Sequence, residues 1–178
     1  MAELTVEDQN LIDNIKERAR DPKRRTLMTE KYGKESYFYL PVNLQQVKDA
    51  EAMLGLHLPA LIREIYLQVG NGGFGPGYGM AGLEGGFKIY TGTLVEESQF
   101  FRAMKDPFPG FGWNDKGWDW KCHYIVYGYW GCNVTTVVDC ELASLPTYSL
   151  DAFTLTRHSS RTLRQWWSDW LDGRIQQY

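Results

Sequence analysis

The chain has 178 residues, 43% of them hydrophobic and 23% charged, which fits one globular domain and excludes disordered and collagen-like chains. Its formal net charge of −3 argues against general nucleic-acid binding, because contacts with phosphates need a basic patch. Aromatic residues make up 15% of the chain, so we expect large aromatic contact areas in a core or at a protein interface.

The first 36 residues predict one helix and a connector. Thr5 and Asp8 form the pattern of a capping box, and apolar residues at helical spacing follow until Asp21. The basic run at residues 16–25 is interpreted as a solvated helix end, with an anionic partner as the alternative. Residues 23–36 are polar and irregular, which predicts a connector without regular structure.

A helical hairpin is predicted next. Asn43 and Gln46 mark the start of a second helix, which Gly55 ends with a left-handed residue. Pro59 suits the first turn of a third helix, and Gly70 is expected to end it in the same way. From residue 70 to residue 86, nine of seventeen residues are glycine, which predicts a shaped loop.

The second half of the chain mixes strands and helices. Residues 87–90 suggest a strand, and a capping box at Thr93 and Glu96 opens a helix that reaches about Met104. Residues 124–127 and 134–138 favour an antiparallel hairpin with its connection at 128–131.

A C-terminal helix is predicted from an aromatic stripe that ends at Gly173. Its tryptophans are interpreted as core residues, because their spacing matches one buried helix face. These residues are Trp166, Trp167 and Trp170. We therefore expect an α+β fold in a single domain, with residues 1–36 packed as an N-terminal helix and connector on residues 37–178.

The segment from Gly77 to Gly82 matches the dinucleotide-binding pattern G-x-G-x-x-G. That motif needs a preceding strand and a following helix whose N-terminus holds the pyrophosphate. Here a predicted helix precedes it and Leu83-Glu84-Gly85-Gly86 follows. We therefore expect a structural or partner-contacting loop, and no cofactor.

Neither a metal site nor an enzyme is expected. Cys122, Cys132 and Cys140 lack the spacing of metal ligands, and their odd number favours free, buried thiols over a disulfide framework. There is no G-x-S-x-G nucleophile motif, and Glu96 and Glu97 diverge by about 100° around a helix. We predict that the chain is not an enzyme.

The chain shows no pattern of a membrane or secreted protein. It lacks an apolar run of roughly 20 residues, and its start lacks the basic and apolar regions of a signal peptide. We expect a cytoplasmic protein with no membrane partner. A monomer is the default expectation, and a homodimer through the aromatic C-terminal helix is the alternative.

The run from Leu44 to Gly86 resembles the SUKH superfamily, whose namesake is a yeast regulator of cell-wall synthesis. The residues that carry the resemblance are Val47, Glu51, Leu54-Gly55, Leu58-Pro59, Tyr66, Val69-Gly70-Asn71-Gly72-Gly73-Phe74 and Gly75-Pro76-Gly77-Tyr78-Gly79. Two later stretches are similar to one branch of the superfamily: 130–140 to its strand pair and 153–173 to its closing helix.

The resemblance implies a SUKH-like domain over residues 37–178, with a curved, mainly antiparallel sheet packed by helices. It also implies protein binding without cofactor or catalysis. Many bacterial members are immunity proteins that bind and neutralise polymorphic or contact-dependent toxin domains, nucleases among them. The alternative is a non-catalytic regulatory module with an unrelated intracellular partner.

A cognate toxin domain is the expected partner, bound through an acidic face, because a toxin domain that attacks nucleic acid must be basic. Direct nucleic-acid binding is not expected. The candidate partner-binding residues are Glu84, Glu96, Glu97, Asp106, Asp115, Asp119, Asp139 and Glu141, with Trp113 and Trp118 as aromatic anchors. For these two tryptophans and Trp120, loop packing is the competing interpretation.

Overall fold

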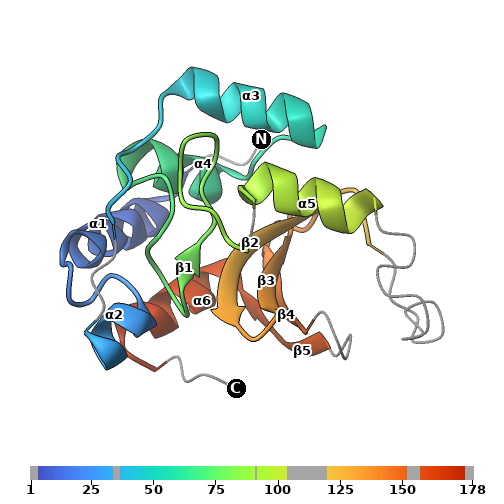
Figure 1. Ribbon diagram of the computed structural model, residues 1–178. Coiled ribbons are helices and arrows are strands. Elements are labelled where there is room, and N and C mark those ends of the chain that lie inside the picture. The colour runs from blue at the N-terminus through green and yellow to red at the C-terminus, as the bar shows by residue number, and fades with distance from the viewer. Residues whose placement is uncertain (1–3, 34–36, 91, 104–119, 152–156, 175–178) are drawn as a thin grey trace.

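The computed structural model describes residues 4–33, 37–90, 92–103, 120–151 and 157–174, with the backbone alone at 157–160 (Figure 1). Six helices and five strands are described. In chain order they are α1 Val6–Arg20, α2 Leu27–Tyr32, α3 Leu44–Leu54, α4 Ala60–Gln68, β1 Gly79–Met80, α5 Leu94–Ala103, β2 Tyr124–Gly131, β3 Val134–Asp139, β4 Pro146–Asp151, β5 Arg157–Thr162 and α6 Leu163–Leu171.

The strands form one sheet in the order β1-β2-β3-β4-β5, and each neighbouring pair is antiparallel. The sheet is curled, with α6 against it and α1 beside α6, while α3 and α5 run side by side (Figure 1). This arrangement confirms the predicted α+β single domain with a curved, antiparallel sheet packed by helices.

Predicted helix starts coincide with observed capping boxes. The side chains of Thr5, Asn43 and Thr93 accept hydrogen bonds from the backbone three residues later, at the starts of α1, α3 and α5. The connector prediction for residues 23–36 is wrong in part, because α2 forms there. Thr26 and Thr29 cap that helix reciprocally, and a Thr-x-x-Thr pattern is a weaker signal than one that ends in Glu or Gln.

The hairpin is longer than predicted. Strand β2 continues through 128–131 to Gly131, so the predicted connection there is wrong. The turn instead consists of Cys132 and Asn133, whose φ values of 48° and 65° are both positive. Two consecutive residues with positive φ give the turn a twist that matches the right-handed twist of the flanking strands. Strands β4 and β5 were not predicted, because β4 begins with Pro146 and β5 is polar.

Residues 87–90 do not form the predicted strand. Ile89 and Gly92 exchange backbone hydrogen bonds of 2.9 Å around a tight turn. Tyr90 lies within this turn with a φ of 48°, a conformation that few non-glycine residues adopt. The chain reverses here and leads directly into α5, while the Phe87 backbone bonds to Asn71 and Gly82 of the glycine-rich loop.

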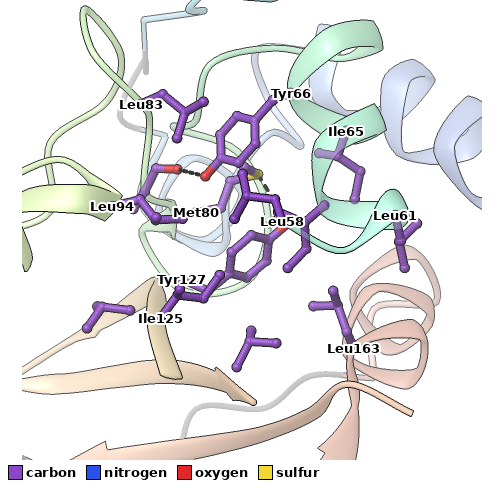
Figure 2. Close-up of a cluster of buried hydrophobic side chains, with 14 of the residues drawn as sticks. Leu58, Leu61, Ile65, Tyr66, Met80, Leu83, Leu94, Ile125, Tyr127 and Leu163 are labelled. Atoms are coloured by element: carbon purple, nitrogen blue, oxygen red, sulfur yellow. Dashed lines mark hydrogen bonds between the residues drawn. The ribbon is translucent and has the colours of Figure 1, made fainter. Parts of the chain in front are cut away.

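The core lies between the sheet and the helices, with buried residues from α1, α3, α4, α5 and α6. Trp166, Trp167 and Trp170 are buried, which confirms that the C-terminal stripe is a core face. The ring of Trp167 packs edge-on against Tyr127 of β2, with centroids 6.2 Å apart. Figure 2 shows Tyr127 and Tyr66 of α4 reaching into one apolar cluster from opposite sides.

The glycine-rich loop is folded tightly onto the body. The Tyr66 hydroxyl donates to the Ala81 carbonyl at 2.6 Å (Figure 2), and Asn71 Oδ1 accepts from the Leu83 amide at 2.7 Å. A Cβ atom added at Gly77 would lie 2.5 Å from the Tyr129 carbonyl oxygen. The glycines of the G-x-G-x-x-G match therefore have a packing reason.

Gly70 is required for a different reason than predicted. Helix α4 ends at Gln68, and Gly70 is absent from the residues with positive φ, so it is not a left-handed cap. A Cβ atom at this position would lie 2.6 Å from the carbonyl oxygen of Tyr39. The extended segment before α3 passes so close to Gly70 that a side chain does not fit.

No helix in the described part of the chain is both long enough and apolar enough to cross a membrane.

Candidate protein-binding surface

The acidic residues predicted to bind a partner have different environments. Glu84, Glu96 and Glu141 are exposed. Glu97 and Asp139 are buried, with 5% and 6% of their surface accessible, because Glu97 faces inward from α5 and Asp139 ends a central strand. The remaining candidates, Asp106, Trp113, Asp115, Trp118 and Asp119, lie outside the described residues.

The three exposed acids have separate neighbours. The Glu84 backbone carbonyl accepts from Gln46 on α3, and the Glu96 carboxylate lies 3.7 Å from the Lys88 ammonium. The Glu141 carboxylate lies 3.4 Å from the His123 ring. Each acid therefore has a different local environment, and the positions of these acids alone do not define a partner-binding surface.

Three tyrosines from distant parts of the chain lie together and define a candidate binding surface. Tyr78 and Tyr90 are 38% and 40% exposed, and the half-buried Tyr129 lies between them. The Tyr129 ring centroid is 5.4 Å from that of Tyr78 and 4.4 Å from that of Tyr90. We call Tyr78, Tyr90, Tyr129 and the adjacent Asn133 the tyrosine surface.

The backbone fixes one end of this surface. The Tyr78 amide donates to the Tyr129 carbonyl at 2.8 Å, and the next residue, Gly79, pairs with Tyr129 between β1 and β2. A Cβ atom at Gly131 would lie 2.7 Å from the Tyr78 ring, so the ring lies directly on the Gly131 backbone. Tyr78 is therefore held in place despite its exposure.

Tyr90 is held at the other end. Its hydroxyl donates to Asn133 Oδ1 at 3.2 Å, which ties the turn before α5 to the β2–β3 turn. Burial raises the pKa of Tyr90 above its ordinary value, and the neighbouring Tyr129 and the charges of Glu97 and Asp151 add to the rise. The hydroxyl therefore stays protonated and remains a hydrogen-bond donor.

Two acidic residues lie near the turns that carry Tyr90 and Asn133. A Cβ atom at Gly92 would lie 3.0 Å from Glu97 Oε1, which places this carboxylate against the turn that carries Tyr90. Asp151 ends β4 opposite Val134, the residue that follows Asn133. Acidic residues of α5 and β4 thus lie near the turns that carry the tyrosine surface, with Glu97 buried and Asp151 partly buried.

Two grooves of the described structure are lined by charged residues that already pair with other parts of the protein. One, of about 640 Å³ between α1 and α6, is lined in part by Arg18, whose guanidinium already donates to Arg24, Leu171 and Glu30. Another, of about 320 Å³, is lined by the ion pair of Asp8 and Arg164. Among the described residues, no group of three His, Cys, Asp or Glu side chains is placed to hold a metal ion.

The cysteines differ from the buried thiols predicted. Cys122 and Cys132 are exposed, and burial raises the pKa of the partly covered Cys140 to about 12. Cys132 is exposed because it forms the β2–β3 turn.

Comparisons with known proteins give no match. No protein-family model matches the chain, and neither curated proteins nor solved structures include a significant match. The function is therefore argued from the geometry of the tyrosine surface. Sequence reasoning missed its members, since nothing local relates Tyr78, Tyr90 and Tyr129 to one another.

Proposed function

We propose that this protein is a bacterial immunity protein of the SUKH type, which binds and neutralises a toxin domain through the tyrosine surface. The observation that carries the proposal is the packed, half-exposed group of Tyr78, Tyr90 and Tyr129. Tyrosine is enriched at protein interfaces because it supplies a large amphipathic contact area with few rotatable bonds.

The rigidity of these tyrosines supports a binding role. A side chain that is already fixed loses little conformational entropy when a partner covers it. Tyr78 lies on Gly131, and Tyr90 is tied to Asn133. The surface therefore resembles the preorganised aromatic anchors of binding hot spots.

The backbone conformation of Tyr90 also supports a functional role for this residue rather than a stabilising one. A φ of 48° at a non-glycine residue costs on the order of 1 kcal/mol. Glycine or asparagine would occupy this position with less strain. A tyrosine occupies this position despite the cost, which is the pattern expected where a residue serves recognition.

The tight packing of residues 70–86 supports protein binding over nucleotide binding. Helix α4 precedes Gly77-Tyr78-Gly79-Met80-Ala81-Gly82, and Gly77 and Gly79 lie in close contact with the protein's own backbone. A phosphate would need that same space. The loop serves instead to present Tyr78.

The test begins with the reading frame directly upstream of this one, where the proposal predicts a toxin domain. We expect the purified chain to bind that domain and to protect cells that express it. Tyr78→Ser together with Tyr90→Gly should weaken binding and protection, whereas Tyr32→Ser, which removes an exposed tyrosine on α2, should change neither. Lack of binding and protection by the unmodified chain would refute the proposal and favour a regulatory module.

A further inference from the structure

We infer that a groove along helix α3 is a second docking site, which takes an amphipathic helix with acidic residues from a partner protein. The groove has a volume of about 590 Å³, and its lining runs along α3 from Leu44 to Gly55 and is completed by Leu56, His57 and Arg63. We call it the α3 groove. It shares no residue with the tyrosine surface, so the inference goes beyond the proposed immunity function and does not depend on it.

The α3 groove follows one face of a helix on the outside of the molecule (Figure 1). The lining residues of α3 and its C-cap recur at steps of three and four residues and form one stripe: Leu44, Val47, Lys48, Glu51, Ala52 and Gly55. Val47 is buried beneath the groove, Leu44 is 52% exposed, and the small Ala52 leaves room for a neighbouring backbone. Helix α3 has 11 residues and is about 16 Å long, which matches about three turns of a partner helix.

The backbone around the groove favours a helix over an extended peptide as the occupant. The α3 backbone is paired within the helix, its first turn is capped by Asn43, and the Gly55 amide donates to the Glu51 carbonyl at 2.9 Å. An extended peptide in this groove would bury its own N–H and C=O groups without partners. A helix pairs these groups internally and needs only an apolar stripe to bind, as in other helix-in-groove complexes.

The charge that the groove offers to a partner is positive. Lys48 is exposed and makes no ion pair or hydrogen bond with the other described residues. The carboxylate of Glu51 is turned to the protein itself, because it accepts from the Leu58 amide at 2.8 Å and the side chain is 12% exposed. Arg63 adds a second cation, which lies 3.4 Å from Glu64. A carboxylate on the partner helix is therefore attracted to Lys48, and a cation at the same place is repelled.

The experiment uses the full chain and three peptides. The probe is a blocked helical peptide of about 14 residues, with leucines at three and four residue steps and glutamates beside them. One control peptide carries lysines in place of the glutamates, and the other has the same composition as the probe with its leucines spread around the helix. We expect a Kd on the order of 100 µM for the glutamate peptide, about tenfold weaker binding of the lysine peptide and no binding of the third. NMR shifts of the Ala52 and Gly55 backbone amides report the position.

Two variants test the assignment to the α3 groove. Lys48→Glu should reverse the preference, with about tenfold weaker binding of the glutamate peptide and tighter binding of the lysine peptide. A merely structural role of Lys48 would not exchange the two peptides. Ala52→Gln extends a neutral side chain into the groove from an exposed helical position and should weaken binding of both peptides. Lys16→Glu, the same charge change on α1, is the matched control and should alter neither, and circular dichroism checks that each variant is folded.

Several results would overturn the inference. These are equal binding of the glutamate and lysine peptides, a preference that Lys48→Glu leaves unchanged, and shifts confined to other surfaces. Binding of the chain to anionic phosphatidylserine vesicles but to no peptide would also overturn it, since that result would assign the groove to a lipid surface. None of these outcomes bears on toxin binding through the tyrosine surface, which is tested separately.

Discussion

Arg164 at the start of α6 donates two hydrogen bonds to the buried carboxylate of Asp8 in α1, at 2.6 and 2.8 Å. The Asp8 side chain is 3% exposed and also belongs to the capping box with Thr5. The pair joins segments 156 residues apart, so the N-terminal helix packs into the same core as the C-terminal one.

Replacing Arg164 should destabilise the protein, because it leaves the Asp8 carboxylate buried with part of its pairing lost. We expect Arg164→Met to reduce the free energy of unfolding by about 1–3 kcal/mol. Urea unfolding at pH 7 measures the loss. The control is Arg174→Met, which removes exposed ion pairs with Asp169 and Asp172 and should change stability by less than about 0.5 kcal/mol. Equal losses for Arg164→Met and Arg174→Met would show that the buried pair of Asp8 and Arg164 contributes no more stability than the exposed ion pairs.

The contribution of Asp8 should depend on pH. Its pKa is lowered in the folded protein, chiefly by the hydrogen bond from Arg164. A lowered folded pKa gives stability that is present above the unfolded pKa and is lost as pH falls through the folded value. The stability difference between the unmodified chain and Arg164→Met should therefore be constant near neutrality and shrink below about pH 4. An unchanged difference down to pH 2 would count against this.

Gly70→Ala should be destabilising although its φ is ordinary, because the added Cβ would lie 2.6 Å from the Tyr39 carbonyl oxygen. We expect a loss of about 1–3 kcal/mol from the displaced segment. Thermal unfolding compares it with Gly85→Asn, where a left-handed backbone has open space around the Cβ position. The same midpoint for Gly70→Ala and the unmodified chain would show that Tyr39 moves away freely.

Two buried tyrosines allow a matched comparison of hydroxyl deletions. Tyr66→Phe removes the 2.6 Å bond to the Ala81 carbonyl and leaves that oxygen without its donor, at a cost of about 1–3 kcal/mol. Tyr127→Phe removes a longer contact of 3.7 Å to the Met80 sulfur and should cost less. Denaturant unfolding shows which of the two variants loses more stability. A larger loss of stability for Tyr127→Phe would show that the glycine-rich loop does not depend on Tyr66.

The thiols should react unequally with iodoacetamide at pH 8. Cys122 and Cys132 are exposed, whereas the pKa of Cys140 is raised to about 12 by burial, so its reactive thiolate is scarce. We expect two labels in the native protein and three after denaturation, counted by mass spectrometry of intact protein. Rapid labelling of Cys140 in the native state would contradict its burial.

Local patterns in the sequence determined most of the helices. Capping residues such as Asn43 and the apolar spacing of α6 act within a few residues of each other, so their effect can be seen without the fold. The β2–β3 pairing was also predicted because its β-branched and aromatic runs are strong and close together. Strands β4 and β5 have a weaker β-strand propensity in their own sequences. Their formation therefore depends more on pairing with neighbouring strands.

The tertiary structure alone decided which residues share a surface. Tyr78, Tyr90 and Tyr129 come from a loop, a turn and a strand. The antiparallel pairing of β1 with β2 brings Tyr78 to Tyr129, and the turn before α5, tied to Asn133, brings Tyr90 to the same ring. The burial of Glu97 beside the exposed Glu96 likewise depends on where α5 packs. Sequence patterns extend over a few residues, whereas a binding surface depends on distances set by the whole chain.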